Sequence, residues 1–327
     1  MLRSFLVTVP ATTANIGPGF DCLGAALSRY NRFYFSDLSP DEAEKTSLRL
    51  EAVGMGAEQV SGQTDNLLYQ SFLRVYRHMG QEPPAIQIKI EMGVPLARGL
   101  GSSATAIVGG IVGANAFGGF GLEDESLLRL AIEQEGHPDN VVPAFLGGCQ
   151  LTIAQDTKLQ DTNTQISQNQ TLFPWTICPI PWGDDIVPVI AIPHFELSTA
   201  TARKVLPLQY DRRDAIFNMA HLGLLIRALE TGNRDWLRSA LNDRIHQPYR
   251  QSLIPGFEAL ETAAIVAGAY GLVISGAGPT LLALTDPQRQ TIVSQALQDT
   301  WKSLGIESEV VTLSLDRSGT QVQQLDF

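Results

Sequence analysis

Two periods of hydrophobic and polar residues run along this chain, and each predicts its own kind of element. Strict alternation predicts a strand over 85–92, where Ile86, Ile88 and Ile90 share one face. The segment 10–24 is instead dense in Gly, Asn and Thr, which predicts a loop. Short apolar runs predict further strands over 6–9, 31–36, 48–53, 186–192, 271–275 and 281–284.

The second period, of three to four residues, predicts helices. Over 66–79 the apolar residues Leu68, Phe72 and Val75 fall on one face, and Gly80 is a good stop signal. Similar reasoning predicts helices over 104–117, 124–135, 213–230 and 256–267. Because strands and helices follow one another without a strict β-α-β rhythm, we predict an α+β fold rather than a doubly wound parallel sheet.

A polar stretch of low complexity, 155–171, interrupts both patterns. It reads QDTKLQDTNTQISQNQT and carries almost no apolar residue that a core would need. We therefore predict an amino-terminal domain over 1–154, a surface insertion or linker over 155–171, and a carboxy-terminal domain over 172–327.

Charge and cysteine usage narrow the classes of function. The 327 residues carry 34 acidic against 23 Lys and Arg side chains, a net charge of −11, which argues against nucleic acid as the main partner. Three widely spaced cysteines favour a reducing cytoplasm over a disulfide framework or a zinc site. The apolar run 104–117 is too short for a membrane span, so we expect no membrane partner.

The segment 95–106, PLARGLGSSATA, lies between a predicted strand and a predicted helix. Glycines allow a tight turn and a close approach to a ligand, and the start of a helix offers unpaired N–H groups that suit phosphate. We predict that this loop binds ATP through Pro95, Leu96, Ala97, Arg98, Gly99, Leu100, Gly101, Ser102, Ser103, Ala104, Thr105 and Ala106.

Two well-known phosphate motifs compete for this segment. A Walker A loop requires a Lys directly before its last Ser or Thr, and none is present. The dinucleotide pattern fits Gly99, Gly101 and Ala104, but the acidic residues about 20 positions on, at 123–125, open a helix instead of ending a strand. A nicotinamide-dependent dehydrogenase is therefore a less favoured function.

Three segments together resemble the GHMP kinases, the superfamily of galactokinase, homoserine kinase, mevalonate kinase and phosphomevalonate kinase. PLARGLGSSA is similar to their phosphate loop, and ISGAGPTLLAL, residues 274–284, to their third motif. VPATTANIGPGFDCLGAAL, residues 9–27, and EGHPDNVVPAFLGG, residues 135–148, are similar to the homoserine kinase branch. The resemblance implies an amino-terminal domain like ribosomal protein S5 domain 2 and a ferredoxin-like carboxy-terminal domain.

The resemblance also implies the reaction and its cofactors. ATP and L-homoserine would give ADP and O-phospho-L-homoserine, with Mg²⁺, on the route to threonine, and a homodimer is compatible with the family. The metal ligands would be Ser103 and Glu135, with Glu133 as the competing carboxylate. Asn66 is similar to a residue on the adenine side, although a helix N-cap explains it equally well.

An amino-acid substrate requires a carboxylate for its ammonium group and arginines for its carboxylate. The resemblance assigns this pocket to Asn15, Asp21, His137, Asn140, Arg203 and Arg250. Asn140 would position the hydroxyl group, and Asp139 is the nearest carboxylate in sequence, which leaves the general base open. A mevalonate-type or sugar-type kinase is less favoured because those substrates lack an ammonium group. A protein of this fold that only binds its ligand is less favoured because Ser103 and Glu135 are both present.

Overall fold

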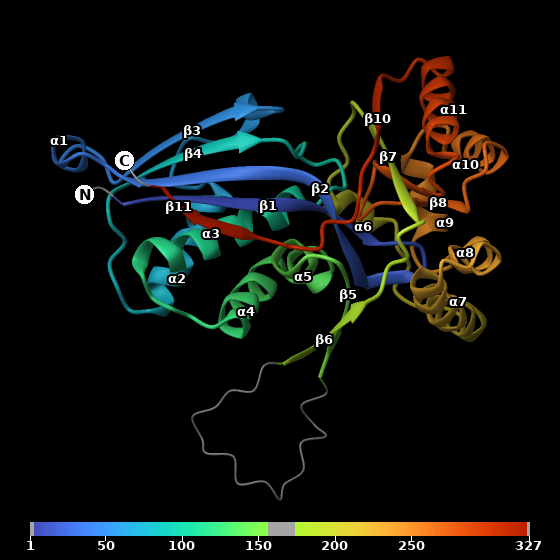
Figure 1. Cartoon of the computed structure of the whole chain (residues 1–327), viewed down its shortest axis with the longest axis horizontal. Coiled ribbons are helices and arrows are strands. Elements are labelled where there is room, and N and C mark those ends of the chain that lie inside the picture. The colour runs from blue at the N-terminus through green and yellow to red at the C-terminus, as the bar shows by residue number, and fades with distance from the viewer. Residues whose placement is uncertain (1–2, 156–173, 326–327) are drawn as a thin grey trace, which may run out of the picture.

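The structure is a computed structural model that describes residues 3–155 and 174–325. Within these ranges the chain builds a seven-stranded and a four-stranded sheet, which lie at opposite ends of the molecule, each with its own helices (Figure 1). Strands and helices are mixed, and almost all strand pairs are antiparallel, so the predicted α+β class is confirmed. No helix in the described part of the chain has the length and apolar character needed to cross a bilayer.

The larger sheet runs in the order β11-β1-β2-β4-β3, and β5 extends it by pairing with β2 and β6. Its strands are β1 (Ser4–Asn15), β2 (Gly19–Asp37), β3 (Leu48–Gly54), β4 (Ile86–Met92), β5 (Cys149–Ala154), β6 (Trp175–Ile180) and β11 (Gln321–Gln324). Only β3 and β4 pair in parallel, and the predicted strands over 31–36, 48–53 and 85–92 are confirmed.

The prediction of a loop over 10–24 is wrong. β1 continues to Asn15 and β2 begins at Gly19, so only a tight turn separates two long paired strands. Asn15, Ile16 and Gly17 all have positive φ, which explains how the chain reverses here. Small residues line these strands because other elements pack closely on them: a Cβ at Gly24 would overlap the carbonyl oxygen of Asp139.

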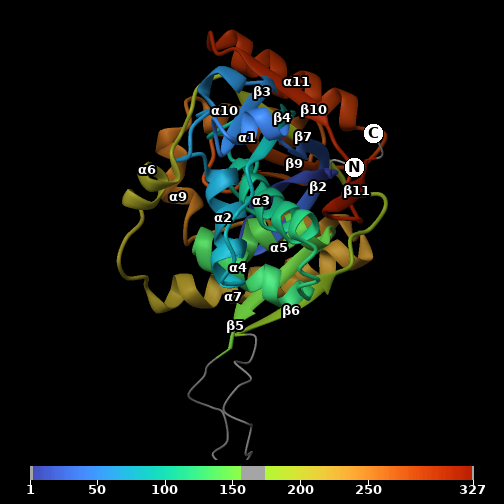
Figure 2. The ribbon, with the colours of Figure 1, turned by 90° about the vertical axis from the view of Figure 1, so that its left-hand side faces the viewer.

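Four helices cover one face of this sheet, and Figure 2 shows them grouped together. They are α2 (Leu67–His78), α3 (Ser102–Gly118), α4 (Asp124–Glu135) and α5 (Pro138–Leu146). Their apolar faces and the sheet share one core, which includes Phe33, Phe35, Phe72, Ile107 and Phe117. The helices expected over 66–79 and 124–135 are confirmed, whereas α5 was not predicted.

The smaller sheet runs in the order β10-β7-β9-β8. Its strands are β7 (Val187–Pro193), β8 (Gly271–Ile274), β9 (Leu281–Thr285) and β10 (Ser308–Thr312), and α10 (Phe257–Val266) and α11 (Gln290–Ser303) pack on it. Apart from the helices inserted between β7 and α10, the succession of β7, α10, β8, β9, α11 and β10 is that of the expected ferredoxin-like unit. The remaining helices are α1 (Pro40–Ala43), α6 (Thr199–Lys204), α7 (Arg212–Thr231), α8 (Arg234–Ala240) and α9 (Gln247–Arg250).

The second half of the chain contributes two strands to the larger sheet. β6 and β11 come from the second half but pair in the larger sheet, where β11 lies along β1 (Figure 1). The chain therefore passes between the two sheets twice, after β6 and before β11, and the predicted division into 1–154 and 172–327 does not follow the sheets. The expected polar insertion lies, except for Gln155, outside the described residues.

Candidate active site

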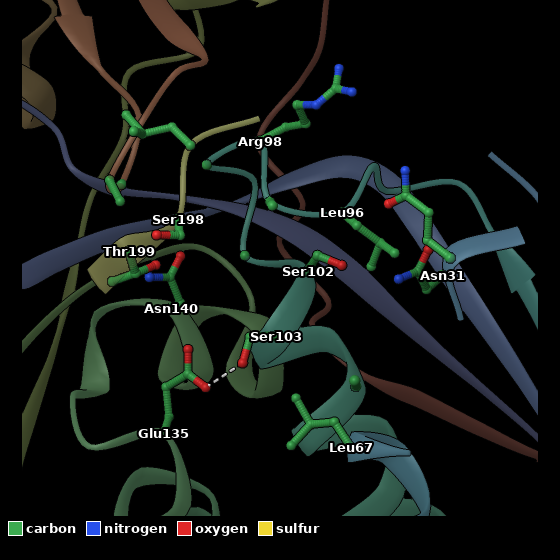
Figure 3. A pocket seen from close by; sticks show the side chains of 18 of the residues that line it. Asn31, Leu67, Leu96, Arg98, Ser102, Ser103, Glu135, Asn140, Ser198 and Thr199 are labelled. Carbon is green, nitrogen blue, oxygen red and sulfur yellow. Dashed lines mark hydrogen bonds between the residues drawn. The ribbon is translucent and has the colours of Figure 1, made fainter. Parts of the chain in front are cut away.

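A cavity of about 520 Å³ opens where the segments of highest chemical interest converge (Figure 3). It is lined by residues of both halves of the chain. The predicted site residues along its wall are Asn15, Asp21, Asn66, Leu96, Ala97, Arg98, Gly99, Gly101, Ser102, Ser103, Ala106, Glu135, His137, Asp139, Asn140, Arg203 and Arg250.

Four residues of the predicted ATP-binding loop do not line the cavity: Pro95, Leu100, Ala104 and Thr105. Their side chains are buried in the scaffold beneath the loop. Thr105, for example, accepts a hydrogen bond from the amide of Asn31, which in turn holds the backbone N–H groups of Gly93 and Val94. These residues shape the loop rather than contact a ligand with their side chains.

The loop itself ends earlier than predicted, because α3 begins at Ser102 instead of Ala104. Gly101 is the N-cap with φ +67°, so Ser102 and Ser103 lie in the first turn with N–H groups that have no partner within the helix. Gly99 has φ +76°, and a Cβ there would meet the carbonyl oxygen of Gly278 at 2.9 Å. The third-motif loop thus packs directly against the phosphate loop.

Arg98 does not point into the phosphate end of the cavity. Its Nη1 donates to the carbonyl oxygen of Pro193 at 2.6 Å, and its Nη2 lies 4.0 Å from Glu196. Figure 3 shows the side chain directed away from Ser103. The guanidinium therefore ties the phosphate loop to β7 and the segment after it.

Ser103 and Glu135 meet at the start of α3. The Ser103 hydroxyl donates to Glu135 Oε2 at 2.7 Å (Figure 3). Burial raises the pKa of the Glu135 carboxyl above its ordinary value, although the Ser103 hydrogen bond and the charge of His137 oppose this. Glu133, the competing carboxylate, instead pairs with Arg74 at 2.7 Å and does not line the cavity.

The opposite end of the cavity carries two arginines and a carboxylate. Arg203 makes two hydrogen bonds with Asp21, at 3.0 and 2.8 Å, which raise the pKa of Arg203. Arg250 is only 2 % exposed and donates to the carbonyl oxygens of Ala202 and Gly276. Burial lowers the pKa of this guanidinium, and nearby Arg203 adds to the effect.

Asn15 supports this end of the cavity through its side chain. Its Oδ1 accepts from the backbone N–H of Asp21 at 2.9 Å, and its Nδ2 donates to the carbonyl oxygen of Gly276 at 2.8 Å. Since both ends of the amide have partners within the protein, Asn15 joins the first motif to the third. The amide thereby holds the backbone of Asp21 in place.

His137, Asp139 and Asn140 form the wall between the two ends. The Nδ1 atom of His137 lies 2.7 Å from Asp139 Oδ1, and this hydrogen bond raises the pKa of His137 although burial opposes it. Asn140 Nδ2 lies 3.4 Å from the same carboxylate oxygen. His137 is the N-cap residue of α5, so the start of one helix places all three side chains.

Asn66 is the N-cap of α2. Its Oδ1 accepts from Leu68 and Tyr69, and its Nδ2 donates to the carbonyl oxygen of Ser61. These contacts favour the N-cap explanation and leave Asn66 to shape the cavity wall rather than to read a base. The side chains around it are mostly apolar, as a flat aromatic ligand requires: Phe33, Val60, Leu67, Leu68, Ile90 and Met92.

Sequence reasoning missed three residues that shape the site: Thr12, Phe20 and His246. The guanidinium groups of Arg203 and Arg250 lie 5.8 and 5.1 Å from the ring centre of Phe20. His246, fully buried, lies 2.8 Å from the carbonyl oxygen of Gly17 through Nε2. Thr12 and Phe20 stand within the first motif, but nothing in their residue type marks them.

Comparison with known proteins supports one family. The sequence matches the family described as GHMP kinases N terminal domain over residues 66–148 and that described as GHMP kinases C terminal over 225–303. The chain therefore has the two-domain fold of the GHMP kinases. More distant solved structures, such as that of L. major mevalonate kinase at 17 % identity and a TM-score of 0.64 over 95 % of this chain and 96 % of that one, share this fold.

Within that superfamily the similarity is concentrated in one branch. Homoserine kinases of Trichormus variabilis and of a Synechococcus species are 53 % and 55 % identical to the chain, over 98 % and 97 % of its length and 99 % and 97 % of theirs. The crystal structure of homoserine kinase from Cytophaga hutchinsonii superposes with a TM-score of 0.83 at 29 % identity, covering 98 % of this chain and 97 % of that one. The chain belongs to the homoserine kinases, and the dehydrogenase hypothesis is wrong.

Proposed function

We propose that this protein transfers the γ-phosphoryl group of ATP to the side-chain hydroxyl group of L-homoserine, a step toward threonine. The observation that carries the proposal is the polarity of the cavity: a carboxylate and two arginines at one end, the phosphate loop at the other, and Asn140 between them. Transfer forms a bond between the hydroxyl oxygen and the γ-phosphorus and breaks the bond to the β,γ-bridging oxygen. ADP leaves, and the hydroxyl proton is released.

The charged end suits the α-amino acid part of the substrate. The Asp21 carboxylate accepts hydrogen bonds from an ammonium group, and a guanidinium binds a carboxylate through two N–H groups. Asp21 and Arg203 form an ion pair with each other in this structure. In the proposal, the ammonium and carboxylate groups of the substrate replace part of that interaction. A mevalonate or a sugar offers no ammonium group, which makes those kinase types less favoured.

The phosphate end suits the nucleotide. In this proposal the first N–H groups of α3 bind the γ-phosphate, and the apolar side chains near Asn66 accommodate the base; the helix start and the cavity lining support this. Asn140 donates from its amide nitrogen toward the reacting oxygens. Asp139 keeps that amide and His137 in place, which makes it a positioning carboxylate in this proposal.

Ser103 and Glu135 fit a magnesium ion bound together with ATP. Among the described residues no cage of three or more His, Cys, Asp or Glu side chains gathers to hold a metal by protein atoms alone. Mg²⁺ in nucleotide sites takes one or two protein oxygens and completes its shell with phosphate and water, and the hydroxyl and carboxylate here match that need. When bound, the ion neutralises charge on the phosphates.

A panel of alcohols tests the proposal. Coupled ADP release is measured with purified full-length protein, MgATP and either L-homoserine, mevalonate, galactose or shikimate. We expect turnover with homoserine at least about a hundredfold faster than with the other three. Comparable rates with mevalonate or galactose would contradict the substrate, and no ADP release with any alcohol would contradict the kinase activity. A cytoplasmic location and a homodimer stay predictions.

A further inference from the structure

The hydroxyl group of Thr12 makes a contact that the proposed reaction has not used. Thr12 lies fully buried in β1, and its Oγ1 donates to Asn140 Oδ1 at 2.8 Å. Its backbone N–H donates to the carbonyl oxygen of Leu100 at 3.1 Å. One residue thus links the phosphate loop to the amide that lies between the two ends of the cavity.

The contacts of Asn140 fix which way its amide faces. A carboxylate only accepts hydrogen bonds, so the nitrogen of the amide lies on the side of Asp139, 3.4 Å from Oδ1. The oxygen then lies on the buried side, where Thr12 donates to it. One of the two amide hydrogens has a partner in Asp139, and the second remains for a ligand in the cavity.

We propose that Thr12 is a positioning residue that holds the amide of Asn140 so that its nitrogen donates to the reacting oxygens. This inference rests on the proposed function. In this arrangement Asn140 stabilises an oxygen of the hydroxyl group or of the γ-phosphate, and it does not take the hydroxyl proton. The hydroxyl of Thr12 acts through Asn140 and touches neither substrate.

Gly101 shows how closely this pair fits beneath the phosphate loop. A Cβ at Gly101 would overlap Thr12 Oγ1 and approach Asn140 Oδ1 to 3.1 Å. The hydrogen bond between Thr12 and Asn140 therefore runs directly under Gly101, the N-cap residue of α3. The backbone N–H of Thr12 also donates to the carbonyl oxygen of Leu100. Thr12 therefore sets the position of the Asn140 amide relative to the phosphate-binding N–H groups.

The first test compares Thr12→Val, Thr12→Ser and the wild type in the ADP-release assay, with whichever alcohol of the panel the wild type phosphorylates. Valine keeps the shape but removes the hydroxyl donor, so we expect kcat to fall roughly 10- to 100-fold, with the KM values of ATP and alcohol within about threefold. Serine restores the donor, and we expect kcat within about threefold of the wild type. An unchanged kcat in Thr12→Val overturns the inference.

Thr152→Val is the matched control. Thr152 is also a buried strand threonine, but its hydroxyl has no hydrogen-bond partner within the part of the chain that the structure describes, and it does not line the cavity. We expect its kcat to equal that of the wild type. An equal loss in both variants would mean that any buried hydroxyl matters, which overturns a specific role for Thr12.

A double-mutant cycle separates positioning from general support of the fold. If Thr12 acts only through Asn140, Thr12→Val causes no further loss of kcat in an Asn140→Ala background. Independent, multiplying losses would overturn the inference while leaving the kinase activity standing. A wild type that phosphorylates only an alcohol other than homoserine contradicts the proposed substrate, yet the same cycle run with that alcohol still decides the role of Thr12.

Discussion

At the scale of single residues, Glu135 is both a proposed metal ligand and a cost to stability. Its side chain is half-buried and accepts a hydrogen bond from Ser103, and burial raises the pKa of the carboxyl. A group whose pKa is higher in the folded than in the unfolded state supports folding fully below its unfolded pKa, and this support is lost as pH rises through the folded pKa. Once the pH exceeds its folded pKa, the ionised Glu135 therefore destabilises the protein without its ligands.

This sign gives a prediction for Glu135→Gln. We expect a higher melting temperature than the wild type at pH 8, a gain that shrinks as pH is lowered toward 5, and a kcat lower by roughly a hundredfold because the proposed metal site loses its charge. Differential scanning calorimetry and the ADP-release assay measure both effects. Glu133→Gln is the control: it is paired with Arg74 outside the cavity, so kcat should not change. A loss of activity only in Glu133→Gln would reverse the assignment.

Arg250 is the residue whose change best tests the substrate end. Arg250→Lys keeps a charge but cannot bind a carboxylate through two parallel N–H groups. We expect the KM of homoserine to rise at least about tenfold, as for the loss of one charge-assisted hydrogen bond, while the KM of ATP stays within about twofold. Steady-state kinetics with each substrate varied in turn measure the split. The exposed Arg238→Lys should change neither value, and an equal rise for both substrates in Arg250→Lys would argue against a homoserine contact.

At the scale of elements, α3 has a glycine at each end, and only Gly101, at its start, belongs to the phosphate loop. Gly101 and Gly119 cap this helix with nearly the same φ, +67° and +63°, so an alanine at either position bears a similar backbone strain of about 1–2 kcal/mol. A Cβ at Gly119 meets no atom within 4 Å, whereas one at Gly101 overlaps Thr12. Alanine at the two positions therefore differs only in the overlap with Thr12, which occurs at Gly101.

We therefore expect Gly119→Ala to lower stability by about 1–2 kcal/mol and leave kcat within about twofold. Gly101→Ala should lose more stability and reduce kcat by roughly a hundredfold, because the loop and the amide of Asn140 both shift. Urea denaturation and ADP release measure the pair. Equal effects of the two substitutions on kcat would show that backbone strain alone accounts for the result.

Elements with one clear period were predictable from the sequence, and elements built around close contacts were not. The alternation of Ile86, Ile88 and Ile90 identified β4 because one face of that strand is buried. The ends of β1 and β2 that meet at the turn resemble a loop in sequence because they are rich in glycine and small residues. These residues are small because segments distant in sequence pack closely on them, as Asp139 does on Gly24. α5 was missed because Pro138 and Pro143 both lie within it.

The same limit applies to the site. Most of the residues that the matching motifs predicted line the cavity, but their contacts could not be predicted from the sequence. Glu135 and Glu133 differ only by position on α4, and the neighbour of each, Ser103 or Arg74, comes from another helix. The sequence around Thr12 contains other threonines, and it does not indicate that the Thr12 hydroxyl contacts Asn140, 128 positions away.

At the scale of the whole molecule, a shared core joins the two sheets. One hydrophobic cluster combines Ile16, Leu23 and Leu27 of the first half with Ile190 and Leu282 of the second. β6 and β11 add strand pairing across the same boundary. The cavity between the halves is therefore bounded by elements that neither half can complete alone, which argues against two domains that unfold independently.

We accordingly expect one cooperative transition in calorimetry, with calorimetric and van't Hoff enthalpies in agreement. Phe72→Ala disturbs the core of the larger sheet and Leu260→Ala that of the smaller sheet, and each should cost about 2–5 kcal/mol. If the halves unfold together, both variants lower the same single transition, by roughly 3–7 °C for a chain of this length. Two resolved transitions, with Phe72→Ala moving only one and Leu260→Ala only the other, would show that the shared core does not couple them.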